Sequence, residues 1–131
     1  MVIDPPSPEY DRLLAAYVAY ARSLGVDLSV GRRLHRLFRE AGLADIHVDA
    51  TIEAHPVGHS RRLIFCDFIN NVRAQLIEGE FMNEANLERN LSALERQLAD
   101  PGVLATSPIY FALRGRVPDK GAVTSEAISR S

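Results

Sequence analysis

His47, Asp49 and His55 are the residues of this sequence that offer the plainest acid–base chemistry. They lie within residues 46–55, where apolar and polar side chains alternate, and this alternation is the pattern of a strand with one apolar and one polar face. Glu53 falls on the same polar face. If that face lined a cavity, an imidazole and a carboxylate on it would act as general acid and base. The other interpretation is a solvated strand face, and the sequence leaves both open.

His55 and His59 have the spacing of two metal ligands on one face of a helix. Pro56 and Gly58 stand between them and prevent a regular helix, so the two rings need not converge. We therefore expect no metal site. Cys66 is the only cysteine of the chain, which excludes an intramolecular disulfide and a thiolate zinc cage.

The composition is that of one ordinary globular domain. The chain has 131 residues, of which 47% are hydrophobic and 24% charged, and its formal net charge is −2. The 15 basic residues are interspersed with 17 acidic ones, so no positive stripe is available for nucleic acid. Charge-free stretches are far shorter than the roughly 20 residues of a membrane-spanning helix. We expect a cytoplasmic protein that binds neither nucleic acid nor membrane.

Periodicity predicts an α+β protein of about four helices and two strands, within a single domain at residues 1–117 and followed by a flexible tail at 118–131. Each helix has a start signal, such as Ser7 followed by a proline, and most end at a glycine, such as Gly42 in the position of a Schellman motif. The predicted helices span residues 8–24, 29–42, 60–78 and 83–98, and the strands span 46–55 and 109–113.

Two strands are too few to make a stable sheet by themselves. The first suits an antiparallel edge, whereas residues 109–113 are apolar on both faces and suit the inside of a wider sheet. We therefore expect either a homodimer, or a larger homo-oligomer, or a partner chain that supplies the missing strands.

Residues 30–48, which read Val-Gly-Arg-Arg-Leu and continue through Ala-Gly-Leu-Ala-Asp-Ile-His-Val, resemble a stretch of class I S-adenosylmethionine-dependent methyltransferases. In that family the stretch forms the last crossover helix and the sixth strand. Residues 109–113 with Gly115-Arg116 resemble the antiparallel seventh strand, and Val2-Ile3-Asp4 is similar to the segment after the fifth strand. The resemblance covers roughly residues 2 to 118 and implies a partial α/β, Rossmann-like fold.

The resemblance implies the C-terminal, substrate-pocket half of a small-molecule methyltransferase. The Gly-rich turn and the ribose-binding carboxylate of that family belong to its N-terminal half, and this sequence contains neither. We therefore expect no cofactor on this chain alone and no activity alone, with S-adenosylmethionine bound only when a cofactor-binding partner chain completes the fold. By the same resemblance Tyr10, Tyr17 and Phe65 are candidates for an apolar substrate pocket, with core packing as the alternative.

Three further functions stay open. The first is a non-catalytic relic of such an enzyme. The second is a self-assembling, domain-swapped interaction protein whose second copy supplies the missing strand partners. The third is a small α+β cyclase or isomerase with an apolar pocket, in which His47, Asp49 and His55 serve as acid and base.

Overall fold

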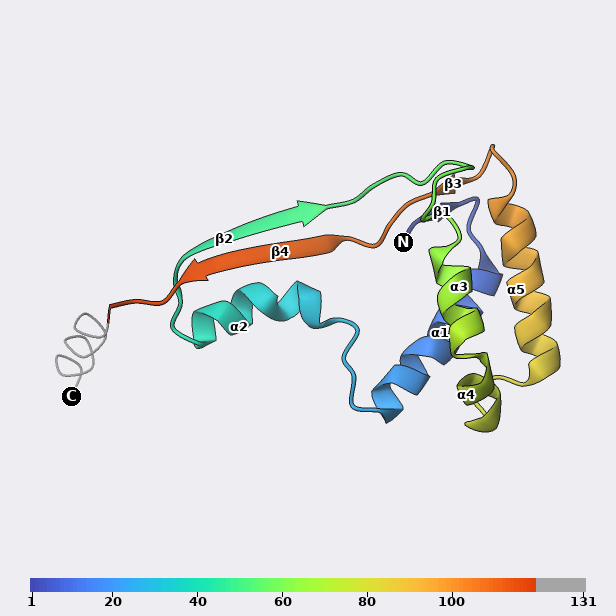
Figure 1. Cartoon of the computed structure of the whole chain (residues 1–131), viewed down its shortest axis with the longest axis horizontal. Helices are drawn as coiled ribbons and strands as arrows, with labels where there is room; N and C mark the ends of the chain where they lie inside the picture. Colours follow the sequence, from blue (N-terminus) through green and yellow to red (C-terminus); the bar gives the residue numbers. More distant parts are fainter. Residues whose placement is uncertain (120–131) are drawn as a thin grey trace. The chain divides into compact units, whose positions relative to one another are not determined.

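The computed structural model describes residues 1–119, and these form two compact units (Figure 1). Unit 1 comprises Met1–Leu28 and Ile52–Ile109, and unit 2 comprises Ser29–Thr51 and the chain from Tyr110 onward. Unit 1 lies within the single domain expected at residues 1–117, and unit 2 extends past residue 117. The single domain itself stays a prediction. Apart from residues 118 and 119, the expected tail lies outside the described residues.

Unit 1 is a helical body with one short sheet. Its helices are α1 (Pro8–Ser23), α3 (Ile64–Asn71), α4 (Arg73–Glu78) and α5 (Glu84–Leu98), and its strands β1 (Ile3–Asp4) and β3 (Leu104–Ala105) pair antiparallel. The helices enclose the core, and the largest fully buried apolar side chains are those of Leu13, Ile69, Leu76, Leu87, Leu94 and Leu98. Every buried apolar side chain of the described residues belongs to this unit.

Side-chain caps explain why the two long helices begin where the sequence predicted. The Ser7 side chain accepts a hydrogen bond from the Tyr10 amide at 3.0 Å, with a proline at the first helical position of α1. Asn83 caps α5 in the same way by accepting from the Asn86 amide at 2.8 Å. Local sequence therefore sets both starting points.

Unit 2 is a two-stranded ribbon covered by a short helical segment. It contains a 3₁₀ turn, η1 (Val30–Arg33), the helix α2 (Leu34–Glu40), and the strands β2 (Ala44–Thr51) and β4 (Tyr110–Arg116). The strands pair antiparallel, with Val48 opposite Leu113 (Figure 1). The Schellman motif predicted at the end of α2 is confirmed, because the Leu43 amide donates to the Phe38 carbonyl at 3.1 Å and Gly42 has a φ of +81°.

Unit 2 has no core of its own. None of its described residues, 29–51 and 110–119, is buried. The apolar side chains of Val48, Tyr110 and Phe111 are 40%, 47% and 36% exposed. Within the described residues β4 pairs along one edge only, because its sheet contains β2 and no other strand. An isolated two-stranded ribbon of this kind is marginally stable in water.

The α+β class is confirmed, but the element count needs correction. The described residues contain five α-helices and four strands instead of four and two. The helix expected at residues 60–78 starts later, at Ile64, and is interrupted at Val72, where two asparagines and a β-branched residue have weak helix propensity. The strands β1 and β3 were missed because each is two residues long and their partners are about a hundred residues apart.

The first predicted strand also ends earlier than expected, at Thr51. Beyond Thr51 the described residues form one isolated bridge, between Ala54 and Thr106. The segment opposite residues 52–54 contains Pro108, which has no amide proton to donate to a strand ladder. Glu53 and His55 therefore do not continue the polar face of β2, and placing them on that face was wrong. The second strand runs further than expected, to Arg116. None of the helices within residues 1–119 combines the length and apolar character needed to cross a membrane.

Candidate functional site

A tight turn in unit 1 brings His59 back onto His55. The His59 amide donates to the Pro56 carbonyl at 2.9 Å, and Gly58 has a φ of +91°, the conformation that a type II turn requires at its third residue. The two imidazoles stack with ring centroids 4.5 Å apart and planes 20° from parallel. The argument that Pro56 and Gly58 prevent a helix is sound, but the turn they form makes the rings converge.

Glu53 completes a cluster with these two histidines. The ligand atoms offered by Glu53, His55 and His59 all lie within 4.8 Å of one another. His55 is 3% exposed, and its Nε2 atom lies 3.7 Å from Oε2 of Glu53, beyond hydrogen-bond distance. This Nε2 is buried without a hydrogen-bond partner in the described part of the chain. A buried imidazole nitrogen without a hydrogen-bond partner is unusual in a folded protein.

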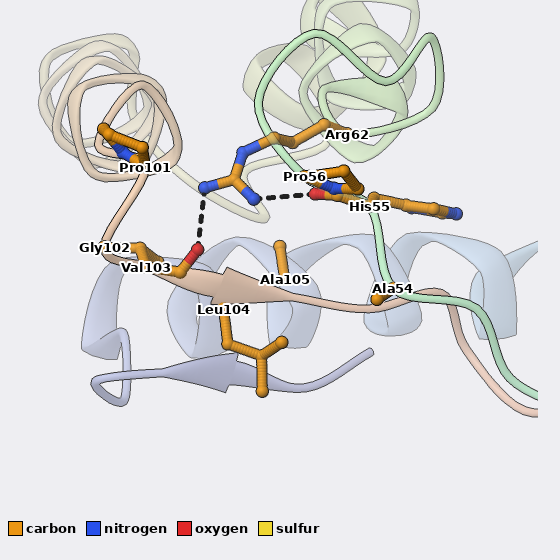
Figure 2. A pocket seen from close by; sticks show the side chains of 9 residues that line it. All are labelled: Ala54, His55, Pro56, Arg62, Pro101, Gly102, Val103, Leu104 and Ala105. Carbon is orange, nitrogen blue, oxygen red and sulfur yellow. Dashed lines mark hydrogen bonds between the residues drawn. The ribbon is translucent and has the colours of Figure 1, made fainter.

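The backbone of the same turn is held by Arg62, a buried cation without a carboxylate partner in the described structure. Its guanidinium donates to four carbonyl oxygens, those of Leu98 at 2.6 Å, His55 at 2.7 Å, Val103 at 2.9 Å and Asp100 at 3.0 Å. Two of these carbonyls follow or end α5, where the helix dipole favours a positive charge. Figure 2 shows the guanidinium between His55 and Val103, with the His55 ring directed away from it.

A cavity of about 350 Å³ lies beside this cation. Pro56, Pro101, Val103 and Leu104 contribute apolar surface to it, and Arg62 and His55 contribute the polar atoms (Figure 2). Because Arg62 already serves four carbonyls, it has little donor capacity left for a ligand. The role of Arg62 is to join the turn after His55 to the end of α5 and to β3.

The other two candidate catalytic residues lie in unit 2. Nε2 of His47 is 3.4 Å from Oδ1 of Asp49 on the polar face of β2, which agrees with the predicted alternation. Both side chains are more than half exposed, so water screens their interaction. His55 belongs to unit 1, and its nearest acidic neighbour in that unit is Glu53.

The aromatic residues assigned to a substrate pocket lie in or against the core of unit 1. Tyr10 and Phe65 are buried and meet edge to face, with ring centroids 4.8 Å apart. Burial raises the pKa of the Tyr10 phenol. Tyr17 is partly buried and packs against the same core. The substrate assignment stays a prediction, and the observed contacts are those of packing.

Cys66 is a buried residue of α3, as the sequence suggested for a lone cysteine. Burial, with the negative charges of Glu95 and Asp67 as smaller contributors, raises the pKa of its thiol to about 12. The thiol is therefore protonated at neutral pH and has no thiolate for nucleophilic attack or metal binding.

Two features were missed from the sequence. The stacked histidines could have been found, because Pro-Val-Gly between them is a type II turn signal and only the helical geometry was considered. The carbonyl contacts of Arg62 have no sequence signal, because main-chain oxygens are the same at every position. No protein-family model matches the chain, and no curated protein is significantly similar to it.

Proposed function

We propose that this chain is the C-terminal, substrate-pocket half of an S-adenosylmethionine-dependent methyltransferase and acts with a separate cofactor-binding chain. The observation that carries the proposal is the antiparallel pairing of β2 with β4, in which β2 is the element that follows the helix α2 along the chain. The resemblance of residues 30–48 and 109–116 to the last crossover helix and the last two strands of such enzymes calls for this order of elements and this pairing.

The unpaired edge of β4 supports the need for a partner. A free strand edge beside exposed apolar side chains favours pairing with another strand. In the proposal that strand belongs to the cofactor-binding half, which also supplies the Gly-rich turn and the ribose carboxylate. The candidate substrate-pocket residues of the proposal are Tyr17, which is partly buried against the core of unit 1, and Tyr10 and Phe65, which are buried in it.

The same edge also favours a second candidate function, self-assembly. A second copy of this chain offers an identical unpaired strand, and two such edges pair across a twofold axis. The two candidates differ in their ligand. A methyltransferase half in complex with its partner binds S-adenosylmethionine, whereas a homodimer contains two identical halves without a cofactor site.

Calorimetry distinguishes them. S-adenosylmethionine is titrated into the chain alone and into the chain mixed with a separately produced cofactor-binding half, a polypeptide that carries the Gly-rich strand–turn–helix of such enzymes. We expect no heat from the chain alone and about micromolar binding by the mixture, which corresponds to about 8 kcal/mol. Phe111→Asp, on β4, is expected to abolish binding by the mixture. Binding by the chain alone, or binding by the mixture that Phe111→Asp leaves unchanged, contradicts the proposal.

A further inference from the structure

We propose that Glu53, His55 and His59 bind a divalent transition-metal ion of the zinc class. The inference departs from the sequence-based expectation of no metal, and it is independent of the proposed methyltransferase function. All three residues belong to unit 1, where His55 precedes the turn at residues 56–59 and His59 is its last residue. The proposal therefore depends only on the geometry within that unit.

The first argument is the spacing of the ligand atoms. They lie within 4.8 Å of one another, whereas two ligands of a tetrahedral zinc ion are about 3.3 Å apart when each bond is about 2.0–2.1 Å long. The longest distance between two of these ligand atoms must therefore shorten by about 1.5 Å at most for all three to bind one ion. Glu53 and His59 reach solvent and have the side-chain freedom to make that movement.

The second argument is the unpartnered nitrogen of His55. Its Nε2 atom is buried, faces the Glu53 carboxylate at 3.7 Å and receives no hydrogen bond from the described residues. A metal ion between this nitrogen and the carboxylate gives both atoms a partner, and among residues 1–119 this is the one buried side-chain nitrogen or oxygen left without a hydrogen bond.

His59 must change one hydrogen bond to take part. Its Nδ1 atom accepts from the Arg61 amide at 3.0 Å. A neutral imidazole that coordinates through one nitrogen carries its proton on the other, so coordination through either nitrogen gives up this bond. The loss of one such bond lowers the affinity of the site for the metal ion by about tenfold.

The ligand set defines the class of ion. Two imidazoles and one carboxylate suit zinc and its neighbours, whereas magnesium and calcium prefer oxygen ligands alone. Three protein ligands leave a fourth position for water, as in the catalytic sites of zinc enzymes. Arg62, the nearby buried cation, does not compete for the carboxylate, because its donors are directed at backbone carbonyls.

The test is titration of the tag-free full chain with zinc chloride by calorimetry, with cobalt chloride as a second probe read by visible absorption. We expect one ion per chain and the absorption of four-coordinate cobalt. His59→Ala and Glu53→Gln are each expected to weaken zinc binding at least tenfold, and both positions reach solvent, so both variants are expected to fold. His47→Ala removes an exposed histidine that also has a carboxylate neighbour, and it is the matched control.

The far-UV circular dichroism of each variant is compared with that of the wild type before titration. His55→Ala removes a buried ring and is interpreted only through its stability, whereas the two exposed variants decide the proposal. An absence of saturable zinc binding by the wild type overturns it. So does binding that His47→Ala weakens as much as His59→Ala does.

Discussion

Replacing Arg62 by methionine removes the cation that joins three segments of unit 1. The guanidinium is 5% exposed and donates four hydrogen bonds of 2.6 to 3.0 Å to main-chain carbonyls. Methionine is unbranched and apolar, so it replaces the aliphatic part of the arginine side chain but has no guanidinium. The substitution therefore removes the hydrogen bonds and keeps the aliphatic packing of the side chain.

The size of the effect follows from two opposing terms. Four hydrogen bonds to a charged donor contribute about 1.5 to 3 kcal/mol each, or about 6 to 12 kcal/mol together. Removing the buried guanidinium also removes its desolvation cost of several kcal/mol, which is not offset by a carboxylate. We expect a net loss of about 3 to 5 kcal/mol, the range measured when a buried charged network is broken.

Urea unfolding followed by circular dichroism measures this loss. With a slope of about 2 kcal/mol/M, a loss of 4 kcal/mol lowers the unfolding midpoint by about 2 M. Arg61→Met is the matched control, because Arg61 is the exposed neighbour, and its effect is expected to stay within about 0.5 kcal/mol. Arg62→Lys is expected to be nearly as destabilising as Arg62→Met, because an ammonium group has three donors and cannot serve four carbonyls. A loss below about 1 kcal/mol for Arg62→Met refutes the reasoning, since the desolvation cost would then cancel the hydrogen bonds.

Three further predictions follow from the packing and the titration behaviour. Light scattering is expected to find the wild type as a homodimer or larger assembly at micromolar concentration and Phe111→Asp as a monomer or unfolded chain. Val117→Asp, at a position that is 78% exposed, is the control and keeps the wild-type mass. A folded wild-type monomer contradicts the prediction. The pKa of the Cys66 thiol is raised from 9.0 to about 12, so the protonated thiol contributes stability that is complete below pH 9 and is lost as pH rises from 9 to 12. The urea midpoint should fall less over this pH range in Cys66→Ser than in the wild type, and equal slopes of midpoint against pH disprove the assignment. Gly79→Ala places a Cβ atom 2.5 Å from the Phe81 ring, so the thermal unfolding midpoint is expected to fall by several degrees. An unchanged midpoint contradicts this and shows that the ring moves away freely.

Local signals were sufficient to predict much of the secondary structure. Ser7, Asn83 and Gly42 act through hydrogen bonds to residues three to five positions away, so the start of α1, the start of α5 and the end of α2 are all predictable from sequence. Alternation likewise predicted β2, although not its end at Thr51, because that end depends on Pro108 in the opposing segment.

The features that depend on distant segments could not be predicted in the same way. The pairing of Ile3 with Ala105 joins residues about a hundred positions apart and involves only two residues on each side. Arg62 contacts carbonyls from three segments, and no side chain identifies them. The candidate metal cluster is intermediate, since its turn is local but the burial of His55 depends on the packing of the whole unit.

The central claim is that β2 and β4 need a strand from another polypeptide to become stable, and hydrogen exchange of β4 tests it most directly. The full chain is separated by size, and deuterium uptake of a peptide covering residues 110–116 is measured by mass spectrometry in the monomeric fraction. Because none of the described residues of unit 2 is buried, we expect this peptide in the monomer to exchange as fast as in a denatured control, while a peptide around Leu91 and Leu94 in α5 stays protected. Slow exchange of residues 110–116 in a monomer, comparable to that of α5, contradicts the claim.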